Sequence, residues 1–431
     1  MSPEFLLLIA LLLGLAAIGT PIGFAMLIAS IAYLFAAGRD VGLAGEQVLN
    51  GLFNSFVLLA VPLFIFAANV MNAGTISDRL LTFCLAVVGR LRGGLAHVNV
   101  VASLIFSGMS GSAIADAAGI GRLLIDMMSR GGRYSPGFAA AITAASATIG
   151  PIIPPSIPMV LYALVSSTSV GALFLGGVVP GLIMAASLMV TVAVIARRRG
   201  FPVEPPVALR ELPRVTFRAF PALMLPVILL GGIYGGVTTP TEAASVAAAY
   251  ALLLSALVYR TLHLRGLIDL LVESTRSSAV VALLIGGAFV LNHIVATEQI
   301  PNDLAHFIAR LELTPLAFLL VVNVAFLLFG CFLDATTMLL VLVPLLMPTV
   351  RQLGIDPVHF GVVIIVNMMI GLITPPYGVL LFVINGLTGI ALRDMIREIW
   401  PFMIVLVVAL FAMVLLPETV LWLPRQFGYG Q

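Results

Sequence analysis

Long apolar runs separated by short polar segments extend along the chain from Phe5 to Leu416. Many of these runs approach or exceed the roughly 20 residues that a helix needs to cross a bilayer. The pattern predicts ten full membrane spans, at residues 5–20, 21–37, 52–73, 135–164, 170–196, 219–236, 240–258, 277–297, 357–386 and 399–416. We therefore expect an all-α polytopic membrane protein, because a soluble protein would expose too much apolar surface and a β-barrel would show short alternating segments.

Two further apolar stretches, 95–130 and 315–350, are long enough to cross but are interrupted in the middle. The first is broken by SGMSGS and has arginines beyond both ends, which places both ends on one side of the membrane. We interpret it as a re-entrant hairpin with its tip at Ser107–Ser112. The second stretch is its counterpart, with a tip at Gly330–Thr337, and is expected to enter from the opposite side.

Two of the predicted spans contain helix breaks. The span 135–164 contains GPIIPP at 150–155, and the span 357–386 contains GLITPP at 371–376. Proline lacks an N–H and clashes with the preceding turn, so neither helix can be continuous. Such breaks expose backbone carbonyls and half-helix ends near the membrane centre, where irregular backbone is tolerated only inside protein or beside a polar cavity.

The two halves of the chain match each other in order. The motif GPIIPP begins at residue 150 and GLITPP at 371, while FSGMSGSA begins at 106 and LFGCFLDA at 328. GTPIGFAMLIASIAYLF, which begins at 19, resembles TTPTEAASVAAAYALLL, which begins at 238. We infer an internal duplication with a first repeat at 1–196, a linker at 197–218 and a second repeat at 219–431.

Charge predicts the orientation of these repeats. The linker 197–218 is rich in arginine, which places it in the cytoplasm. Five spans per half then place both chain ends in the periplasm and make the repeats inverted copies, as in many secondary transporters. The alternative, in which 5–37 and 219–258 are each one long span, leaves more arginines outside and stays open. The chain start lacks the basic region of a cleaved signal, so we expect the first span to be retained.

The hairpin tips and helix breaks carry the candidate chemistry. Freed carbonyls and side-chain oxygens suit a hard cation such as Na⁺. The side chains that offer such oxygens are Ser110, Ser112, Ser146, Thr148 and Ser156 in the first half, and Asp334, Thr336, Thr337, Asn367 and Thr374 in the second. Asp116 and Asp334 also lie near the hairpin tips, where a charged residue is a functional candidate by default.

Structural interpretations compete with these functional ones. The prolines could be simple kinks, the small residues of SGMSGSA could only allow close helix packing, and Asp116 could satisfy free N–H groups at a helix start. Glu242 follows Thr239 and Pro240 in the pattern of a capping box, so we expect it to be structural.

Composition excludes several classes of protein. Only 9% of the residues are charged, and no basic patch alternates with aromatic residues, so nucleic acid binding is not expected. The two cysteines lie in separate apolar runs and the five histidines lack metal-ligand spacing, so no disulfide or transition metal site is expected. No enzyme is expected either, because the acids are scattered and the serines lie at hairpin tips. A channel would need a continuous polar path, which the sequence does not show.

Five motifs together resemble a known family: SGMSGSAIAD, GPIIPPSIPMVLYA, TPTEAASVAAAYALL, GCFLDATTMLLVLVPLLMP and GLITPPYGVLLFV. They are similar to those of the large membrane subunit (DctM-type permease) of tripartite ATP-independent periplasmic (TRAP) transporters. The resemblance covers essentially the whole chain. It implies an elevator-type fold with two re-entrant hairpins and two broken helices, in the inner membrane of a bacterium.

The resemblance also implies a function. Members of this family import organic acids, such as C4-dicarboxylates, sialic acids or related sugar and keto acids, with Na⁺ as the coupling ion and without ATP. A periplasmic substrate-binding protein delivers the substrate, and a small four-helix membrane subunit pairs with the large one in the lipid bilayer. The alternative is a standalone Na⁺-coupled organic anion carrier without a binding protein.

The family's motifs imply specific site residues. The expected Na⁺ ligands are Ser110, Gly111, Ser112, Gly150, Pro154, Ser156, Gly330, Asp334, Thr336, Gly371, Thr374 and Pro375. The expected substrate contacts are Ser112, Asp116, Pro155, Asp334, Thr337 and Pro376. The chain departs from the family where Thr336 and Thr337 follow FLDA, since apolar residues are common at this point.

The expected geometry, with two hairpin tips that enter from opposite faces and enclose one central site, also predicts a motion. The hairpins and broken helices are expected to move as one unit past a scaffold that contains 5–37 and 219–258. The segments 75–92 and 302–312 are short and mixed in polarity, so we expect them to be interfacial arms that connect the two parts.

Overall fold

The structure is a computed structural model that describes residues 2–53, 55–73, 76–203, 210–331 and 333–429. The described chain is built from helices, and its only β-type pairing is an isolated bridge between Arg92 and Val203. Six of its helices are long and apolar enough to cross a membrane, or seven if one bent pair of helices counts as a span. The prediction of an all-α polytopic membrane protein is confirmed.

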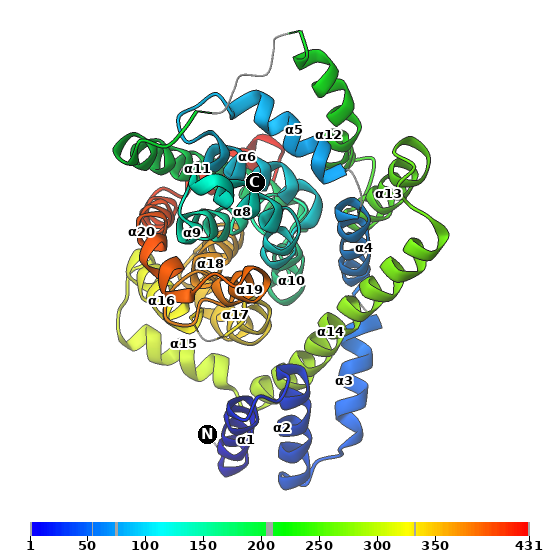
Figure 1. Ribbon diagram of the computed structural model, residues 1–431. Helices are drawn as coiled ribbons and strands as arrows, with labels where there is room; N and C mark the ends of the chain where they lie inside the picture. The colour runs from blue at the N-terminus through cyan, green and yellow to red at the C-terminus, as the bar shows by residue number, and fades with distance from the viewer. Residues whose placement is uncertain (1, 54, 74–75, 204–209, 332, 430–431) are drawn as a thin grey trace.

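Figure 1 shows the helices in two groups. We call the first group the outer arc. It contains α1 (Pro3–Ala17), α2 (Ile22–Ala36), α3 (Gly42–Phe53), α4 (Ala60–Asn72), α12 (Leu212–Tyr234), α13 (Pro240–Leu253) and α14 (Leu264–Thr297). The long helix α14 packs against α2, α3 and α4, so helices from both halves of the sequence hold the outer arc together.

We call the second group the inner bundle. Its helices from the first half are α6 (Gly94–Ser110), α7 (Ala113–Asp116), the π-helical turn η2 (Ala117–Gly121), α8 (Arg122–Ser129), α9 (Pro136–Ala147), α10 (Ile157–Ser166) and α11 (Val170–Arg199). Those from the second half are α16 (Pro315–Phe329), α17 (Ala335–Gln352), α18 (Pro357–Gly371), α19 (Val379–Thr388), α20 (Leu392–Leu415) and α21 (Glu418–Gln426). Two helices connect the groups along the chain: α5 (Ile76–Val88) leads into α6, and α15 (Ile300–Arg310) leads into α16.

Each broken helix of the inner bundle contacts both halves of the chain. The segments before the breaks, α9 and α18, pack against the first hairpin arm of their own half, α6 and α16 respectively. The segments after the breaks pack against the returning hairpin arm of the other half: α10 against α17, and α19 against α7, η2 and α8. The hairpins and broken helices of the two halves are therefore interlocked and cannot separate without exposing buried apolar surface.

Polar side chains fasten the outer arc. Asn69 on α4 donates a hydrogen bond to Ser274 Oγ on α14 at 2.9 Å. At the far end of α14, Glu298 accepts hydrogen bonds from the hydroxyl groups of Tyr33 at 2.6 Å and Ser2 at 2.8 Å. These two hydroxyl donors hold the pKa of the Glu298 carboxyl below its usual value, and they tie α14 to α1 and α2.

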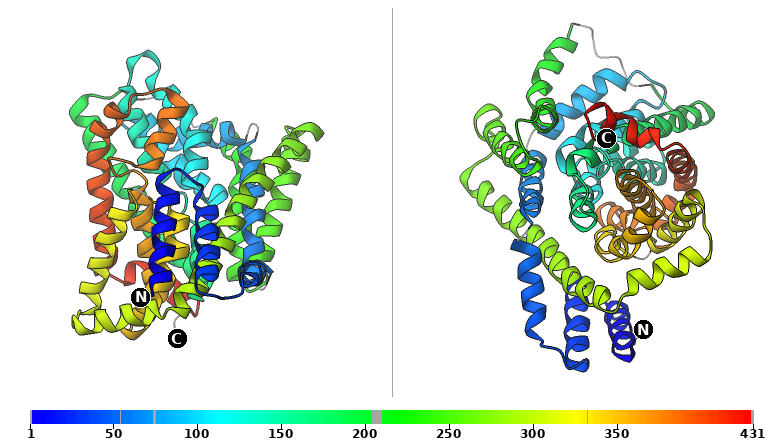
Figure 2. Two further views of the ribbon diagram at one scale, coloured as in Figure 1. Left: turned by 90° about the horizontal axis from the view of Figure 1, so that it is seen from below. Right: turned by 180° about the vertical axis from the view of Figure 1, so that it is seen from behind.

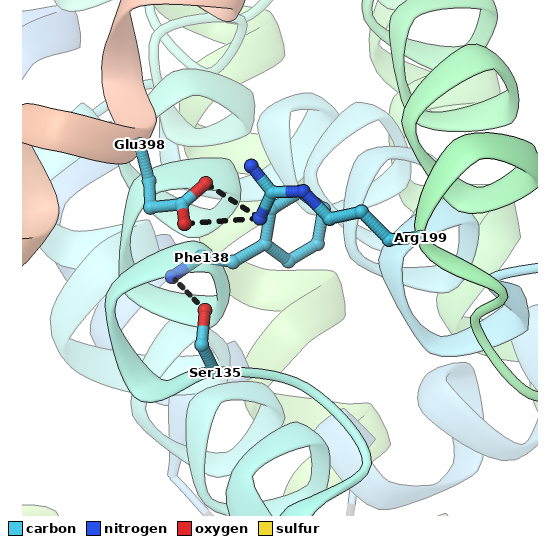
Figure 3. A network of polar contacts seen from close by, with 4 residues as sticks. All are labelled: Ser135, Phe138, Arg199 and Glu398. Atoms are coloured by element: carbon cyan, nitrogen blue, oxygen red, sulfur yellow. Dashed lines mark hydrogen bonds and ion pairs between the residues drawn. The ribbon is translucent and has the colours of Figure 1, made fainter.

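An ion pair holds two long helices of the inner bundle to the start of the first broken helix. Arg199 Nη1 at the end of α11 lies 2.8 Å from Glu398 Oε2 on α20 (Figure 3). The guanidinium carbon lies 5.7 Å from the ring centroid of Phe138, a fully buried residue of α9 whose backbone N–H is capped by Ser135 Oγ. The rings of Phe201 and Phe402 pack around Phe138 at centroid distances of 4.9 and 5.8 Å.

Three predicted segments differ from the structure, and one helix was not predicted. The expected span 52–73 is not one helix, because α3 ends at Phe53 and a 3-10 turn (Phe56–Leu59) precedes α4. The span 277–297 begins earlier, at Leu264, because the charged residues before it are exposed on α14 and do not end the helix.

The predicted linker 197–218 is shorter than expected, since α11 continues to Arg199 and α12 begins at Leu212; residues 204–209 of the linker lie outside the described chain. Helix α21 was missed because its mixed polarity resembles a tail. The marks for the two chain ends lie toward the same end of the molecule in the left view of Figure 2. The predicted capping box is confirmed: Thr239 N donates to Glu242 Oε2 at 2.7 Å, and Glu242 N donates to Thr239 Oγ1 at 3.3 Å.

Candidate functional site

The tip of the first hairpin lies directly on the first helix break. Helix α6 ends at Ser110, and Gly111 turns the chain in the left-handed conformation with φ +59°. A Cβ atom built on Gly111 would lie 2.5 Å from the carbonyl oxygen of Pro155, so only glycine allows this approach. The tip and the break are therefore in contact, and this contact brings a proline carbonyl against the hairpin backbone.

Asp116 is a buried carboxylate below this tip, with 2% of its surface exposed. Its Oδ1 accepts a hydrogen bond from Ser110 Oγ. Its Oδ2 is buried and has no hydrogen-bond partner within the described chain. A Cβ atom on Gly150 would lie 2.5 Å from this Oδ2, so the free oxygen faces the start of the break. An unpaired buried carboxylate oxygen is costly unless a cation or proton satisfies it.

The first break itself is held by Ser156. Its hydroxyl accepts a hydrogen bond from Met159 N at 3.2 Å as the N-cap of α10, and it donates to the carbonyl oxygen of Pro151. The residue is fully buried, so its hydroxyl shapes the break and does not face open solvent. The bond between Pro154 and Pro155 is cis.

The second hairpin tip is organised by Asp334, the N-cap of α17. Asp334 Oδ1 accepts hydrogen bonds from Thr336 N at 2.9 Å and Thr337 N at 3.2 Å, and Oδ2 accepts one from Thr337 Oγ1. The carboxylate is nevertheless exposed, while Thr337 is buried. Asp334 therefore caps the helix and also presents an accessible negative charge. The Thr337 hydroxyl is used to hydrogen-bond the Asp334 carboxylate.

The second break packs backbone to backbone against the second hairpin. A Cβ atom on Gly371, at the end of α18, would lie 3.0 Å from the Cα of Gly330 at the end of α16. Beyond it, Thr374 Oγ1 donates to the Ile370 carbonyl at 2.8 Å, and Gly378 N donates to the Thr374 carbonyl at 3.0 Å. The bond between Pro375 and Pro376 is cis, as in the first break.

Both tips meet at a cavity of about 300 Å³ between the inner bundle and the outer arc. The polar residues in its wall are Ser110, Gly111, Ser112, Asp334 and Thr336 from the hairpin tips, and Asn69 and Ser277 from the outer arc. Pro151, Ile157, Pro158, Leu372 and Val379 of the broken helices and Ile65, Ala68 and Val281 of α4 and α14 add apolar surface. Hydroxyl groups, backbone amides and one carboxylate in an otherwise apolar pocket can orient a small polar solute.

The cavity divides the predicted site residues into two classes. Five expected Na⁺ ligands form part of its wall: Ser110, Gly111, Ser112, Asp334 and Thr336. The other expected Na⁺ ligands are not in the wall: Gly150, Pro154, Ser156, Gly330, Gly371, Thr374 and Pro375. Of the expected substrate contacts, Ser112 and Asp334 line the cavity, whereas Asp116, Pro155, Thr337 and Pro376 do not. Asp116 and Pro155 lie behind the first tip, and Pro376 is exposed elsewhere.

Sequence reasoning missed the contribution of the outer arc. Asn69 and Ser277 line the cavity together with the hairpin tips; Asn69 follows an apolar run in α4, and Ser277 lies in the polar run 273–278 of α14. The sequence feature that could have found them is that polar residues in membrane spans seldom face lipid. Neither could be assigned to the site without knowing that α4 and α14 pack beside the tips.

Comparison with protein families identifies the chain's relatives. Residues 9–419 match the model of the DctM component of the tripartite ATP-independent periplasmic transporters. The sialic acid TRAP transporter large permease protein SiaM of Vibrio cholerae is 44% identical over 421 residues, which cover 97% of this chain and 98% of that protein. The C4-dicarboxylate TRAP transporter large permease protein DctM of Pseudomonas aeruginosa is 42% identical, covering 86% of this chain and 87% of that protein.

A further relative is the 2,3-diketo-L-gulonate TRAP transporter large permease protein YiaN of Escherichia coli, 37% identical over 96% of this chain and 98% of that protein. Among solved structures, the YdaH transporter of Alcanivorax borkumensis superposes with a TM-score of 0.63 over 87% of each chain. MtrF of Neisseria gonorrhoeae superposes with a TM-score of 0.59 over 89% of this chain and 85% of that one. Both structures are 15% identical in sequence, so they support the transporter fold alone.

Proposed function

The chain belongs to the DctM component family of the tripartite ATP-independent periplasmic transporters, and from this premise we propose that it imports organic acids across the bacterial inner membrane in symport with Na⁺. Proteins of this family are multi-pass transporter permeases and not enzymes. The observation that carries the proposal is the cavity of about 300 Å³, where both hairpin tips and both broken helices meet two helices of the outer arc.

The first Na⁺ site of the proposal is behind the first hairpin tip. Asp116 Oδ2 is buried and unpaired within the described chain, and it faces Gly150. Ser110 Oγ and the Pro155 carbonyl lie on the same side of the tip. A carboxylate, a hydroxyl and carbonyl oxygens are the ligands that hard cations prefer. Asp116 thus fits a cation ligand better than the substrate contact expected from the sequence, since a carboxylate repels an organic anion.

The second Na⁺ site of the proposal is at the second tip. Asp334 and Thr336 lie in the cavity wall, and Gly330 and Gly371 bring the second break against the hairpin. Two uncompensated carboxylates beside the cavity would weaken binding of an organic anion. Na⁺ bound at both places removes this repulsion, so Na⁺ should bind before the substrate and raise its affinity.

The substrate of the proposal occupies the cavity itself. Ser112 and Thr336 offer hydroxyl groups to the carboxylate of an organic acid, and Asn69 and Ser277 of the outer arc offer further donors. The apolar wall at Pro158 excludes water from the far side. C4-dicarboxylates, sialic acids and sugar or keto acids have the polarity for this wall, and the relatives' names include such substrates.

The position of the cavity between the two helix groups supports an elevator motion. The inner bundle is interlocked and contains both tips, while α5 and α15 connect it to the outer arc. Sliding of the inner bundle past the outer arc would expose the same cavity alternately to the two sides of the membrane. The inverted repeats at 1–196 and 219–431 would supply the two related end states, with both chain ends in the periplasm.

The partners of the proposal are a small membrane subunit and a periplasmic binding protein. Relatives are named large permease proteins of TRAP transporters, a name that implies a smaller partner. The rival function is a standalone Na⁺-coupled carrier of organic anions. Co-expression with a tagged small subunit distinguishes them, since the standalone carrier would be purified alone and would transport without a binding protein.

The proposed function is tested by uptake into liposomes. The purified complex is reconstituted and supplied with labelled substrate and its binding protein, with Na⁺ or K⁺ outside. We expect uptake only with Na⁺, enhanced by an inside-negative potential and independent of ATP. Equal uptake in K⁺ would overturn Na⁺ coupling, and full uptake without binding protein would favour the standalone carrier.

A further inference from the structure

A buried chain of hydrogen bonds joins the first hairpin to the first broken helix. Ser103 Oγ on α6 donates to Ser146 Oγ on α9 at 2.9 Å, and Ser146 Oγ donates to Asn99 Oδ1 on α6 at 3.0 Å. Asn99 Nδ2 then donates to Thr143 Oγ1 on α9 at 2.6 Å, and Thr143 Oγ1 donates to the Ala139 carbonyl at 2.8 Å. All four side chains are at most 3% exposed. We call this chain the first clamp.

The second half has a corresponding contact. Asn367 Nδ2 on α18 donates to the Asn323 backbone carbonyl on α16 at 2.7 Å and to Asn323 Oδ1 at 2.9 Å. Asn323 Nδ2 donates to the Leu319 carbonyl at 2.8 Å. Both asparagines are at most 2% exposed. We call this pair the second clamp.

The clamps occupy equivalent places in the two halves. Ser146 lies one helical turn before Gly150, and Asn367 lies one turn before Gly371. Their partners Ser103 and Asn323 lie about two turns before Ser110 and Gly330, near which α6 and α16 end. Each clamp therefore joins a hairpin arm to a broken helix just below the place where the tip meets the break.

The sequence had suggested a different role for two of these residues. Ser146 and Asn367 were candidate oxygen donors to a cation. The Ser146 hydroxyl is engaged with α6, whereas Asn367 is engaged with α16 through Nδ2 and its buried Oδ1 has no hydrogen-bond partner within the described chain. In a dry interior, each of these polar groups is costly when its partner is removed, so the helix pairs α6–α9 and α16–α18 are held at one separation. The close contacts of Gly150 and Gly371 lie one turn beyond the clamps, so they depend on that separation.

We propose that the two clamps are positioning elements that set the distance between each hairpin tip and its helix break, and thereby the Na⁺ affinity at each tip. The Na⁺ part of this proposal rests on the proposed function. The first clamp acts through Ser110, Asp116 and Gly150, and the second acts through Gly330 and Gly371.

The direction of the hydrogen bonds predicts which residue of each clamp matters more. Ser146 is the central member of the first clamp, so Ser146→Ala removes the hydrogen-bond partner of both Ser103 Oγ and Asn99 Oδ1. Ser103→Ala removes only the first hydrogen bond of the clamp. Asn367→Ala removes both bonds of the second clamp. Asn323→Ala leaves the bond from Asn367 to the backbone carbonyl at residue 323 intact.

The test measures half-saturating Na⁺ for uptake by the reconstituted complex, and thermal stability of each variant. We expect Ser146→Ala and Asn367→Ala to raise half-saturating Na⁺ by about fivefold or more, with smaller shifts for Ser103→Ala and Asn323→Ala. Tyr162→Phe is the matched control, because it removes a buried hydrogen bond of 2.7 Å between α10 and the Pro357 carbonyl at the opposite end of α18. It should lower stability and leave half-saturating Na⁺ unchanged.

A second readout does not depend on Na⁺ coupling. Hydrogen exchange of peptides 107–113 and 333–340 reports whether the tips are held against the breaks. We expect faster exchange at 107–113 in Ser146→Ala and at 333–340 in Asn367→Ala, each confined to its own half. Wild-type exchange and wild-type Na⁺ dependence in a folded clamp variant would overturn the proposal, as would equal shifts in Tyr162→Phe. Uptake by the unmodified complex that ignores Na⁺, with exchange changed as expected, would overturn the proposed coupling but keep the positioning role.

Discussion

Gly150 faces the one unpaired oxygen of Asp116: a Cβ atom on Gly150 would lie 2.5 Å from Asp116 Oδ2. The two residues come from different elements, the end of the first broken helix segment and the return arm of the first hairpin. Only a glycine here lets the buried carboxylate pack this closely against the break. This relationship is the most specific local support for a cation between the hairpin and the break.

Gly150→Ala should abolish Na⁺-dependent uptake, because the added methyl group occupies the space beside Asp116 Oδ2 or displaces the carboxylate. The measurement is uptake against Na⁺ concentration. Gly386→Ala in α19 is the control, since a Cβ atom there meets nothing within 4 Å. A normal Na⁺ curve for Gly150→Ala would show that this space is not used.

Asp116→Asn should weaken Na⁺ binding, because it removes the negative charge but keeps the size and the bond with Ser110. Loss of a charged partner costs about 1.5–3 kcal/mol, so half-saturating Na⁺ should rise roughly tenfold or more. Asp126→Asn, on the exposed face of the same hairpin, should behave as wild type. If Asp116→Asn instead changed only the substrate KM, the residue would be a substrate contact after all.

Pro154→Ala combined with Pro155→Ala should impair transport more than folding. Alanine restores two N–H groups and favours helix, so the break can close and withdraw the carbonyl that lies against Gly111. Expression and thermal stability should survive while Na⁺-dependent uptake falls. The contrary result, an unchanged Na⁺ curve in the double variant, would mean that these prolines are simple kinks.

A cysteine pair across the cavity should report the elevator motion. Ser277→Cys on α14 and Ala335→Cys on α17 both line the cavity, one from each helix group. Their crosslinking yield should change when Na⁺ and binding protein are added, because the inner bundle moves past the outer arc. Arg199→Cys with Glu398→Cys lies within the inner bundle and should crosslink equally in all conditions. A constant yield for both pairs during active uptake would favour local gating by the hairpins.

Glu398→Gln should affect stability and not coupling. It weakens the ion pair with Arg199, whose side chain is 44% exposed, so the loss should be at most about 1 kcal/mol. The stacking of the guanidinium on Phe138 remains. Thermal unfolding should occur at a slightly lower temperature, and half-saturating Na⁺ should equal that of wild type. A shifted Na⁺ curve would link this ion pair to the site.

Much of the fold could be predicted from the sequence, because its signals are local. The clustered prolines and glycines at 150–155 and 371–376 interrupt their helices, whereas prolines outside such clusters lie inside α11, α12, α17 and α20; the structure has the breaks between Ala147 and Ile157 and between Gly371 and Val379. The capping box at Thr239 and Glu242 involves residues within one helical turn, so it too could be predicted from the sequence. Helix α14 was predicted too short because the exposure of charged residues on a helix depends on its neighbours.

The candidate site was only partly readable from the sequence. The motifs identified Ser110, Ser112 and Asp334, which do line the cavity. The motifs could not show that Asp116 has an unpaired buried oxygen, whereas the Ser146 hydroxyl is hydrogen-bonded to a neighbouring helix. Both are polar residues close to a tip or a break. Whether a polar atom is free or paired depends on contacts between segments that are distant in sequence.

The sequence by itself therefore determined the class of protein, the two hairpins, the two helix breaks and the residue types available at them. Hydrophobic length and proline placement act within a single segment, so they need no partner to be decisive. Only the tertiary structure decided that α10 and α19 cross to the opposite half, that Asn69 and Ser277 complete the cavity wall, and which oxygens remain free. These outcomes depend on packing between helices, where glycines such as Gly111 and Gly371 allow a close approach that a Cβ atom would prevent.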